Sequence, residues 1–112
     1  MRRASRVGAQ DESSIFTSGD LKVDLAGHLV HLRGREVNLT PIEFRLLAAM
    51  IKQAGKVVTQ RQLLKEVWGP HLTEESHYLR VFVHQLRRKL EDDPARPKFI
   101  LTEAGVGYRL RV

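Results

Sequence analysis

The chain has 112 residues, with 19 Lys and Arg against 13 Asp and Glu, and its net charge of +6 favours a polyanionic partner, either nucleic acid or an anionic membrane surface. A hydrophobic fraction of 42% excludes general disorder, and the lack of cysteine excludes a disulfide framework or a thiolate metal site. No apolar run approaches the roughly 18 residues of a membrane span, so we expect a soluble, cytoplasmic protein without a membrane partner.

The N-terminal third is expected to hold a tail and a sheet. Residues 1–13 are polar and aperiodic, which predicts a linker or tail ahead of one domain over residues 14–112. From residue 15 to 39, short alternating runs separated by Gly-containing turns indicate an antiparallel sheet of three or four strands, the last at residues 37–39. His28 and His31 fall in these predicted strands without a carboxylate or cysteine at ligand spacing, so we expect no metal there.

Three helix starts follow. Thr40 precedes a Pro and lies three residues before Glu43, and this spacing of Thr and Glu is typical of a capping box. Thr59 and Gln62 have the same spacing, with Gln in place of Glu. Thr73 precedes two carboxylates, which suit the positive end of a helix dipole. The apolar residues behind the first two caps recur at helical spacing and are expected in the core: Ile42, Leu46, Leu47, Met50 and Ile51, then Leu63, Leu64, Val67 and Trp68.

The third predicted helix, over residues 73–91, has two opposed faces. Its apolar stripe consists of Leu79, Phe82, Val83, Leu86 and Leu90. The opposite face carries hydrogen-bond donors and positive charge without a carboxylate: His77, Arg80, His84, Arg87 and Arg88, with Gln85 at its edge. Because an α-helix fits the DNA major groove, this face is typical of a recognition helix. The alternative is a solvated cationic face on a core helix. Lys89 lies at the flank of this helix, where we expect it to be only part of a charged rim.

The C-terminal residues 98–112 return to alternation around a Gly-containing tip at residues 103–107, which predicts a β-hairpin. Glu103 lies at this predicted tip, where it would repel a nearby phosphate. A capped helix, a short connection, a basic helix and a hairpin together have the layout of a helix-turn-helix with a wing. The predicted fold is therefore α+β, a winged helix-turn-helix with an N-terminal antiparallel sheet, three helices and a C-terminal hairpin.

Enzymatic motifs are absent from the sequence, so we expect no catalytic residues and no cofactor. There is no GxSxG, P-loop, HExxH or cysteine nucleophile. Residues 105–107 (Gly-Val-Gly) open no helix and fit turn geometry. The adjacent Glu74 and Glu75 are explained by the electrostatics of a helix start.

The segment LTPIEFRLL, residues 39–47, resembles the LTxxEFxLL signature of the effector domain of OmpR/PhoB-type bacterial response regulators. Four later blocks match that family in order, at residues 58–64, 67–69, 86–90 and 105–109, so the resemblance covers about residues 15–112. Residues 76–80, 93–97 and 102–103 look most like the member of that family that regulates a potassium-uptake system.

The resemblance implies a DNA-binding domain normally joined by a linker to an N-terminal receiver phosphorylated on Asp, a receiver that is missing from this chain. It also implies sequence-specific binding to double-stranded DNA, as a homodimer on direct-repeat half-sites, and control of transcription. In such proteins the loop between the second and third helices, here residues 69–72, often faces RNA polymerase.

Matching the family position by position gives the expected DNA-contacting residues. On the recognition helix they are His77, Arg80, Val81, His84, Gln85, Arg87 and Arg88. Thr59 and Gln60 stand where the preceding helix meets a phosphate, and Tyr108 and Arg109 belong to the wing; core packing is the alternative for Tyr108, and a structural or solvated role for Arg109. Arg87 is expected to present a bidentate fork to guanine or phosphate. Many relatives carry Arg near the wing tip, where this chain has Glu103 and Ala104.

Two other functions fit the same composition. One is a winged helix whose basic face docks an acidic protein, and the other is a membrane-surface or RNA binder that uses charge alone. The polar side chains of His84 and Gln85 among the cations favour contacts to base edges over bulk charge. A membrane helix would need exposed apolar bulk, whereas here the core needs the apolar stripe.

Overall fold

The computed structural model describes residues 14–72 and 76–112. By contacts the chain divides into two compact units, residues 1–38 and residues 39–112. The prediction of one domain over residues 14–112 stays a prediction, and the predicted tail over residues 1–13 lies outside the described part.

The first unit is a four-stranded antiparallel sheet. Its strands pair in chain order, and their bounds are β1 Ile15–Ser18, β2 Leu21–Asp24, β3 Leu29–Leu32 and β4 Arg35–Glu36. In β2 the expected alternation is present, because Leu21 and Val23 are fully buried while Lys22 is exposed.

Two details of this sheet differ from the sequence pattern. His28 was expected in a strand but has φ +56° and belongs to the turn before β3. The last strand is at Arg35–Glu36 and not at residues 37–39. Arg33 and Gly34 both have positive φ, at 52° and 80°, so a two-residue turn returns the chain earlier than the pattern suggested.

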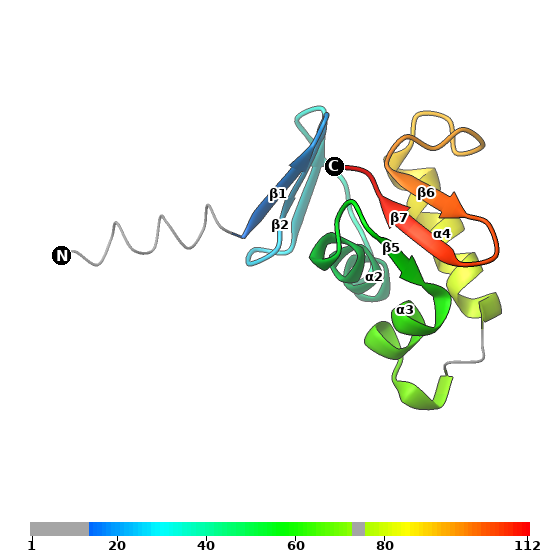
Figure 1. Ribbon diagram of the computed structural model, residues 1–112. Coiled ribbons are helices and arrows are strands. Elements are labelled where there is room, and N and C mark those ends of the chain that lie inside the picture. Colours follow the sequence, from blue (N-terminus) through cyan, green and yellow to red (C-terminus); the bar gives the residue numbers. More distant parts are fainter. Residues whose placement is uncertain (1–13, 73–75) are drawn as a thin grey trace. The chain divides into compact units, whose positions relative to one another are not determined.

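The second unit combines helices with a three-stranded antiparallel sheet (Figure 1). Its helices are α2 Pro41–Lys52, α3 Gln60–Val67, the short 3₁₀ turn η1 Pro70–Leu72 and α4 Ser76–Leu90. Its strands are β5 Val57–Thr59, β6 Ile100–Glu103 and β7 Gly107–Leu110, in the spatial order β5-β7-β6. Figure 1 shows β6 and β7 lying alongside α4.

Both predicted capping boxes are present. The Thr40 hydroxyl accepts the Glu43 N–H at 3.3 Å, and the Glu43 carboxylate accepts the Thr40 N–H at 2.9 Å. Thr59 and Gln62 make the same reciprocal pair at 3.1 and 3.0 Å. These bonds satisfy helix-end donors that would otherwise lack partners. The third predicted cap, Thr73, lies outside the described residues.

The three helices close over a core of aliphatic side chains that are at most 3% exposed: Leu46, Leu47, Met50, Leu63, Leu64, Val67, Leu79, Val83, Leu86, Leu90, Ile100 and Leu110. Four residues expected there are only half-buried, namely Ile42, Ile51, Trp68 and Phe82. Trp68 is the C-cap of α3. The centroid of its ring lies 5.4 Å from the ring centroid of Phe82 and 6.5 Å from that of Tyr78. These rings therefore form an aromatic cluster at the edge of the core.

Strand β5 was not expected, and it turns the predicted hairpin into a three-stranded sheet. It pairs with β7, with Thr59 opposite Gly107. At Gly107 a Cβ atom would lie 2.0 Å from the Val58 carbonyl oxygen, so only glycine permits this approach. The sequence pattern did not predict β5, because this strand has only three residues and its partner strand lies far along the chain.

Candidate nucleic-acid interface

The outward face of α4 brings together most of the residues that the sequence nominates. The exposed members, at spacings of three and four residues, are His77, Arg80, Val81, His84, Gln85 and Arg88. As described from Ser76 to Leu90, α4 contains no Asp or Glu. The face therefore offers donors, positive charge and one exposed aliphatic side chain, Val81, which is 40% exposed.

Arg87 departs from this group. Its Nε and Nη2 donate to the Ile100 carbonyl oxygen at 3.1 and 2.9 Å, and Nη2 also donates to the Thr102 hydroxyl at 2.6 Å. The Nε–Nη2 edge of the expected fork is therefore occupied inside the protein, and contact of Arg87 with DNA stays a prediction. Burial lowers the pKa of Arg87, with Tyr108 and Glu91 acting in the opposite direction, and the group stays a cation at neutral pH.

The predicted wing residues are also engaged within the protein. Tyr108 is only 7% exposed, in accord with the core alternative, and its ring centroid lies 5.8 Å from the Arg87 guanidinium carbon. Arg109 Nε donates to the Glu103 carboxylate at 2.8 Å. Glu103 is the last residue of β6 and pairs with Gly107, so it was wrongly placed at the tip, and its charge is partly neutralised.

Thr59 and Gln60 lie where α3 begins, next to the wing tip. The Thr59 side chain is used in the cap, and the Gln60 N–H donates to the Val106 carbonyl oxygen at 3.3 Å. The structure therefore brings the start of α3 and the turn between β6 and β7 together, although residues 59 and 106 are far apart in sequence.

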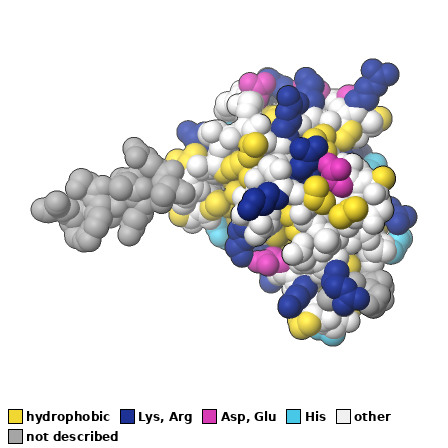
Figure 2. Space-filling view, viewed as in Figure 1, with side chains coloured by type: hydrophobic (Ala, Val, Ile, Leu, Met, Phe, Trp, Pro, Cys, Tyr) yellow, Lys and Arg dark blue, Asp and Glu magenta, His cyan; other side chains and the backbone are white. Residues whose placement is uncertain are grey.

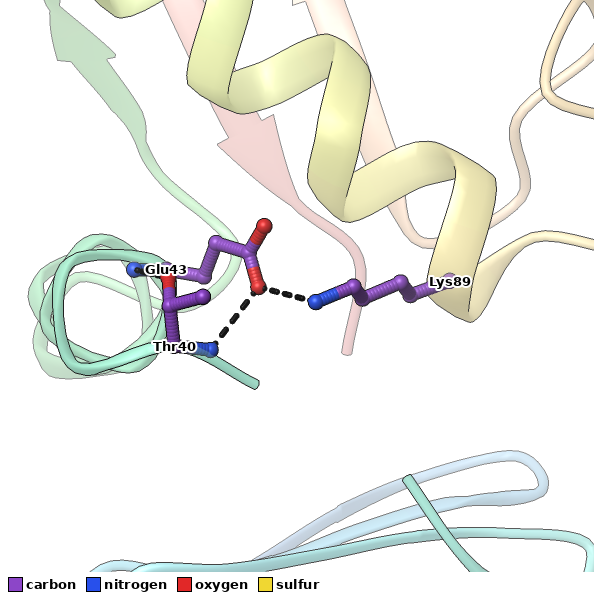
Figure 3. Close-up of polar contacts among 3 residues, drawn as sticks. All are labelled: Thr40, Glu43 and Lys89. Carbon is purple, nitrogen blue, oxygen red and sulfur yellow. Dashed lines mark hydrogen bonds and ion pairs between the residues drawn. The ribbon is translucent and has the colours of Figure 1, made fainter. Parts of the chain in front are cut away.

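Lys89 is more than the charged rim expected from the sequence. Its Nζ lies 2.6 Å from Glu43 Oε1, and this carboxylate also accepts the Thr40 N–H (Figure 3). Glu43 is 2% exposed, and burial alone would raise its pKa, but the bonds from Lys89 and Thr40 outweigh burial and lower the pKa. One carboxylate thus caps α2 and ties it to the last turn of α4.

Glu91 was missed by sequence reasoning. Its carboxylate is buried at the end of α4 and accepts the backbone N–H groups of Lys98, Phe99 and Ile100 at 2.7 to 3.2 Å. A sequence signal existed, because a carboxylate at the negative end of a helix dipole is unfavourable unless donors compensate it. Nothing in the sequence pattern marked Thr102 as a partner of Arg87.

Figure 2 shows Lys and Arg side chains spread over the face that it presents, with fewer Asp and Glu among them. Within residues 14–72 and 76–112, no cluster of His, Asp or Glu is arranged to hold a metal ion. No helix of that part is both long and apolar enough to cross a bilayer.

Residues 34–110 match the family described as "Transcriptional regulatory protein, C terminal". The chain belongs to this family. It is 55% identical over 109 residues to the KDP operon transcriptional regulatory protein KdpE of Escherichia coli K12, covering 97% of this chain and 48% of that protein. It is 50% identical over 107 residues to KdpE of Mycobacterium tuberculosis H37Rv, covering 96% of this chain and 47% of the relative.

Solved structures agree with this family. The Klebsiella pneumoniae RstA DNA-binding domain, in complex with the RstA box, has a TM-score of 0.79 at 28% identity and covers 87% of this chain and 96% of its own. DrrB of Thermotoga maritima, an OmpR/PhoB homologue, has a TM-score of 0.75 at 33% identity and covers 98% of this chain and 50% of its own.

These similarities confirm both the family and the fold predicted from the sequence. The chain is an OmpR/PhoB-type effector domain with a winged helix-turn-helix, most like KdpE. The relatives are transcriptional regulators. The chain spans about half the length of the curated relatives it matches.

Proposed function

We propose that this domain binds double-stranded DNA sequence-specifically and controls transcription as the output part of a two-component regulator. The observation that carries the proposal is the exposed face of α4, which has donors and positive charge and, from Ser76 to Leu90, no carboxylate. The family supports it, because the related RstA domain was solved in complex with its DNA box.

The side chains of this face match the chemistry of the major groove. Arg80 and Arg88 suit guanine or phosphate, Gln85 suits adenine, and the Val81 methyl groups suit the methyl of thymine. The two histidines of the face add further donors. The start of α3, at Thr59 and Gln60, and the wing residues Tyr108 and Arg109 are proposed to meet phosphates beside the groove.

The regulated genes are proposed to be potassium-uptake genes. The support is the resemblance to the potassium-uptake regulator and the 55% identity to a protein named for the KDP operon. Such a protein would act in the cytoplasm, where its DNA target lies.

Three partners are proposed from the family. A receiver domain, phosphorylated on Asp, would precede this domain in the whole protein, and two copies would bind direct-repeat half-sites. RNA polymerase would contact residues 69–72, where η1 exposes Pro70 and His71.

The proposal is tested by selecting duplexes from a random-sequence pool with the purified chain. We expect one enriched motif, and a changed preference in that motif for Gln85→Ala. Lys22→Ala, which alters an exposed cation of the first unit, serves as the control and should select the same motif as the unaltered chain. A pool without enrichment, together with capture of an acidic protein by the α4 face, would favour the protein-docking alternative.

A further inference from the structure

The C-terminal end of α4, together with the residue that follows it, holds Ile100 of the wing by both of its backbone polar groups. The Ile100 N–H donates to Glu91 Oε2 at 2.9 Å, and the Ile100 carbonyl oxygen accepts from Arg87 Nε and Nη2 at 3.1 and 2.9 Å. The Ile100 side chain is fully buried. Arg87 and Glu91 are one helical turn apart and so lie above one another. We call Arg87, Glu91 and Ile100 the α4–wing clamp.

The clamp acts on the open edge of the wing sheet. The strand order is β5-β7-β6, and in the described part of the chain no other strand pairs with the outer edge of β6. At Ile100 that place is taken by two side chains, Arg87 in α4 and Glu91 directly after the last residue of α4. The contact extends along the edge, since Glu91 also accepts the N–H groups of Lys98 and Phe99, and Arg87 also donates to Thr102.

The clamp reaches the second strand of the wing as well. The Arg87 guanidinium lies 5.8 Å from the ring centroid of Tyr108 on β7, within the range of a cation–π contact. Its bonds are charge-assisted on both sides, because a guanidinium donates to a carbonyl and a carboxylate accepts amide protons. Glu91 is 6% exposed, so water competes little for these bonds.

We propose that Arg87 and Glu91 are positioning residues that fix the direction in which the wing leaves the recognition helix, so that α4 and the wing meet one duplex together. The inference rests on the proposed DNA-binding function and gives Arg87 a role within it. Arg87 acts on DNA through the hairpin and not as a contact to a base. Moving its guanidinium to DNA would leave the Ile100 carbonyl and the Thr102 hydroxyl without these donors.

The first test needs no DNA. In the NMR spectrum of the unaltered chain, we expect the Arg87 Nε–H to exchange slowly and to show scalar coupling to the Ile100 carbonyl carbon across the hydrogen bond. Arg80 and Arg88, which are exposed, should exchange fast. A fast-exchanging Arg87 would overturn the clamp. Because this readout does not depend on DNA, a failure of DNA binding would leave the clamp result standing and would count only against the proposed function.

The second step adds the selected duplex to the same sample. The coupling from Arg87 to Ile100 should persist while the resonances of Arg80 and Arg88 shift. Loss of the coupling, with a new contact from Arg87 to phosphate or guanine, would overturn the positioning role and restore the direct one.

The DNA affinities of Lys and Ala variants provide an independent test of whether Arg87 positions the wing or contacts DNA directly. An ammonium cannot bridge Ile100 and Thr102 as the guanidinium does, so Arg87→Lys should bind DNA within about twofold of Arg87→Ala. The matched variant Arg88→Lys should retain more of its affinity than Arg88→Ala, because its charge alone suffices at a phosphate. Rescue by Arg87→Lys would overturn the positioning role.

Thr102→Val removes one partner of the clamp from the exposed side of β6 without changing its charge. The effects of Arg87→Ala and Thr102→Val on DNA affinity should be non-additive, whereas those of Arg88→Ala and Thr102→Val should add. Additive effects for the pair Arg87 and Thr102 would contradict the clamp. If Arg87→Ala does not fold, the cycle is completed with Arg87→Lys.

Discussion

At the scale of single residues, the carboxylate of Glu43 carries several interactions at once. It completes the cap of α2 and pairs with Lys89, and its side chain is only 3% exposed. The chain contains a matched contrast in Glu66, which pairs with Lys52 on the surface, where the two side chains are 47% and 64% exposed. Because only the first pair contains a buried carboxylate, we expect the two ion pairs to contribute differently to the stability of the fold.

Glu43→Gln should lower the free energy of unfolding by about 1–3 kcal/mol at pH 7, because a buried cap and ion pair lose their charge. The pKa of Glu43 is lowered by folding, so its stabilisation is present above the ordinary carboxyl range and is lost as the pH falls through the folded pKa. The difference between Glu43→Gln and the unaltered chain should therefore shrink in acid.

Urea unfolding at pH 7 and pH 3 measures both effects. The control Glu66→Gln should change stability by less than about 0.5 kcal/mol at either pH, as is usual for an exposed pair. Equal losses of unfolding free energy for the two variants at pH 7 would show that the buried pair contributes no more stability than the exposed pair.

Glu103 gives a second prediction at the scale of single residues. The sequence suggested that Glu103 repels phosphate from the wing tip, whereas in the structure it lies in β6 and pairs with Arg109. The carboxylate holds Arg109 at 2.8 Å, so Glu103→Arg both adds a cation and releases Arg109. If the wing lies near the duplex, general DNA affinity should rise and the salt slope should steepen by about 0.9 for each new phosphate contact. Filter binding at several salt concentrations measures this, with Glu36→Arg in the first unit as a charge-matched control. Equal effects of the two variants would place the wing tip away from DNA.

At the scale of elements, the wing hairpin of β6 and β7 belongs to a three-stranded sheet, and both outer strands of that sheet, β5 and β6, are connected to helices. β5 leads directly into α3, because Thr59 is both the last residue of β5 and the N-cap of α3. The other outer strand, β6, is held by Arg87 of α4 and by Glu91, which directly follows α4. The close approach of β5 and β7 at Gly107 is what links the start of the helix-turn-helix to the wing.

Gly107→Ala should therefore destabilise the domain by more than about 2 kcal/mol, because its Cβ would meet backbone atoms of β5 and cannot be accommodated by a side-chain movement. Thermal or urea unfolding measures the loss. Gly105 is the control in the same turn, where φ is +76° and no atom lies within 4 Å of a Cβ. Gly105→Asn should cost less than about 1 kcal/mol, because Asn tolerates that backbone region. Comparable losses would mean that β5 yields to the new methyl group.

At the scale of the whole molecule, the charge of +6 is general, whereas the carboxylate-free surface of α4 is local. Because phosphate binding releases counterions, DNA affinity should fall steeply with salt, with a log–log slope of roughly −3 to −5 for about four contacts. Titration of a labelled duplex measures it. Arg80→Ala should reduce the slope by about 0.9 and Lys22→Ala should leave it unchanged. A flat response would favour a protein partner.

A second prediction at this scale concerns copy number. On its own the chain should be mainly monomeric and should pair on DNA with two direct half-sites about 10–10.5 base pairs apart, since both copies of α4 then meet the same side of the duplex. Light scattering and gel shifts measure this. A duplex with about five extra base pairs between the half-sites is the control and should lose the pairing. A stable dimer without DNA would contradict the prediction.

The sequence by itself determined what local chemistry and periodicity decide. Thr40 with Glu43, and Thr59 with Gln62, start their helices as predicted, because a capping box involves only residues three apart. The 3.6-residue period of α4 separated Leu79 and Leu86 from Arg80 and His84 correctly, since a helix of this kind buries one stripe. The ordered motifs of residues 39–109 then sufficed to identify the family.

Only the tertiary structure decided which polar side chains of the predicted site are occupied within the protein. By spacing Arg87 belongs with Arg80 and Arg88, yet its guanidinium is bonded to β6, and Lys89 and Arg109 have carboxylate partners. Each of these contacts joins residues on different elements, so no local pattern contains it. The physical reason is that a long side chain can reach several partners, and the packing of α4 against β6 and α2 selects among them.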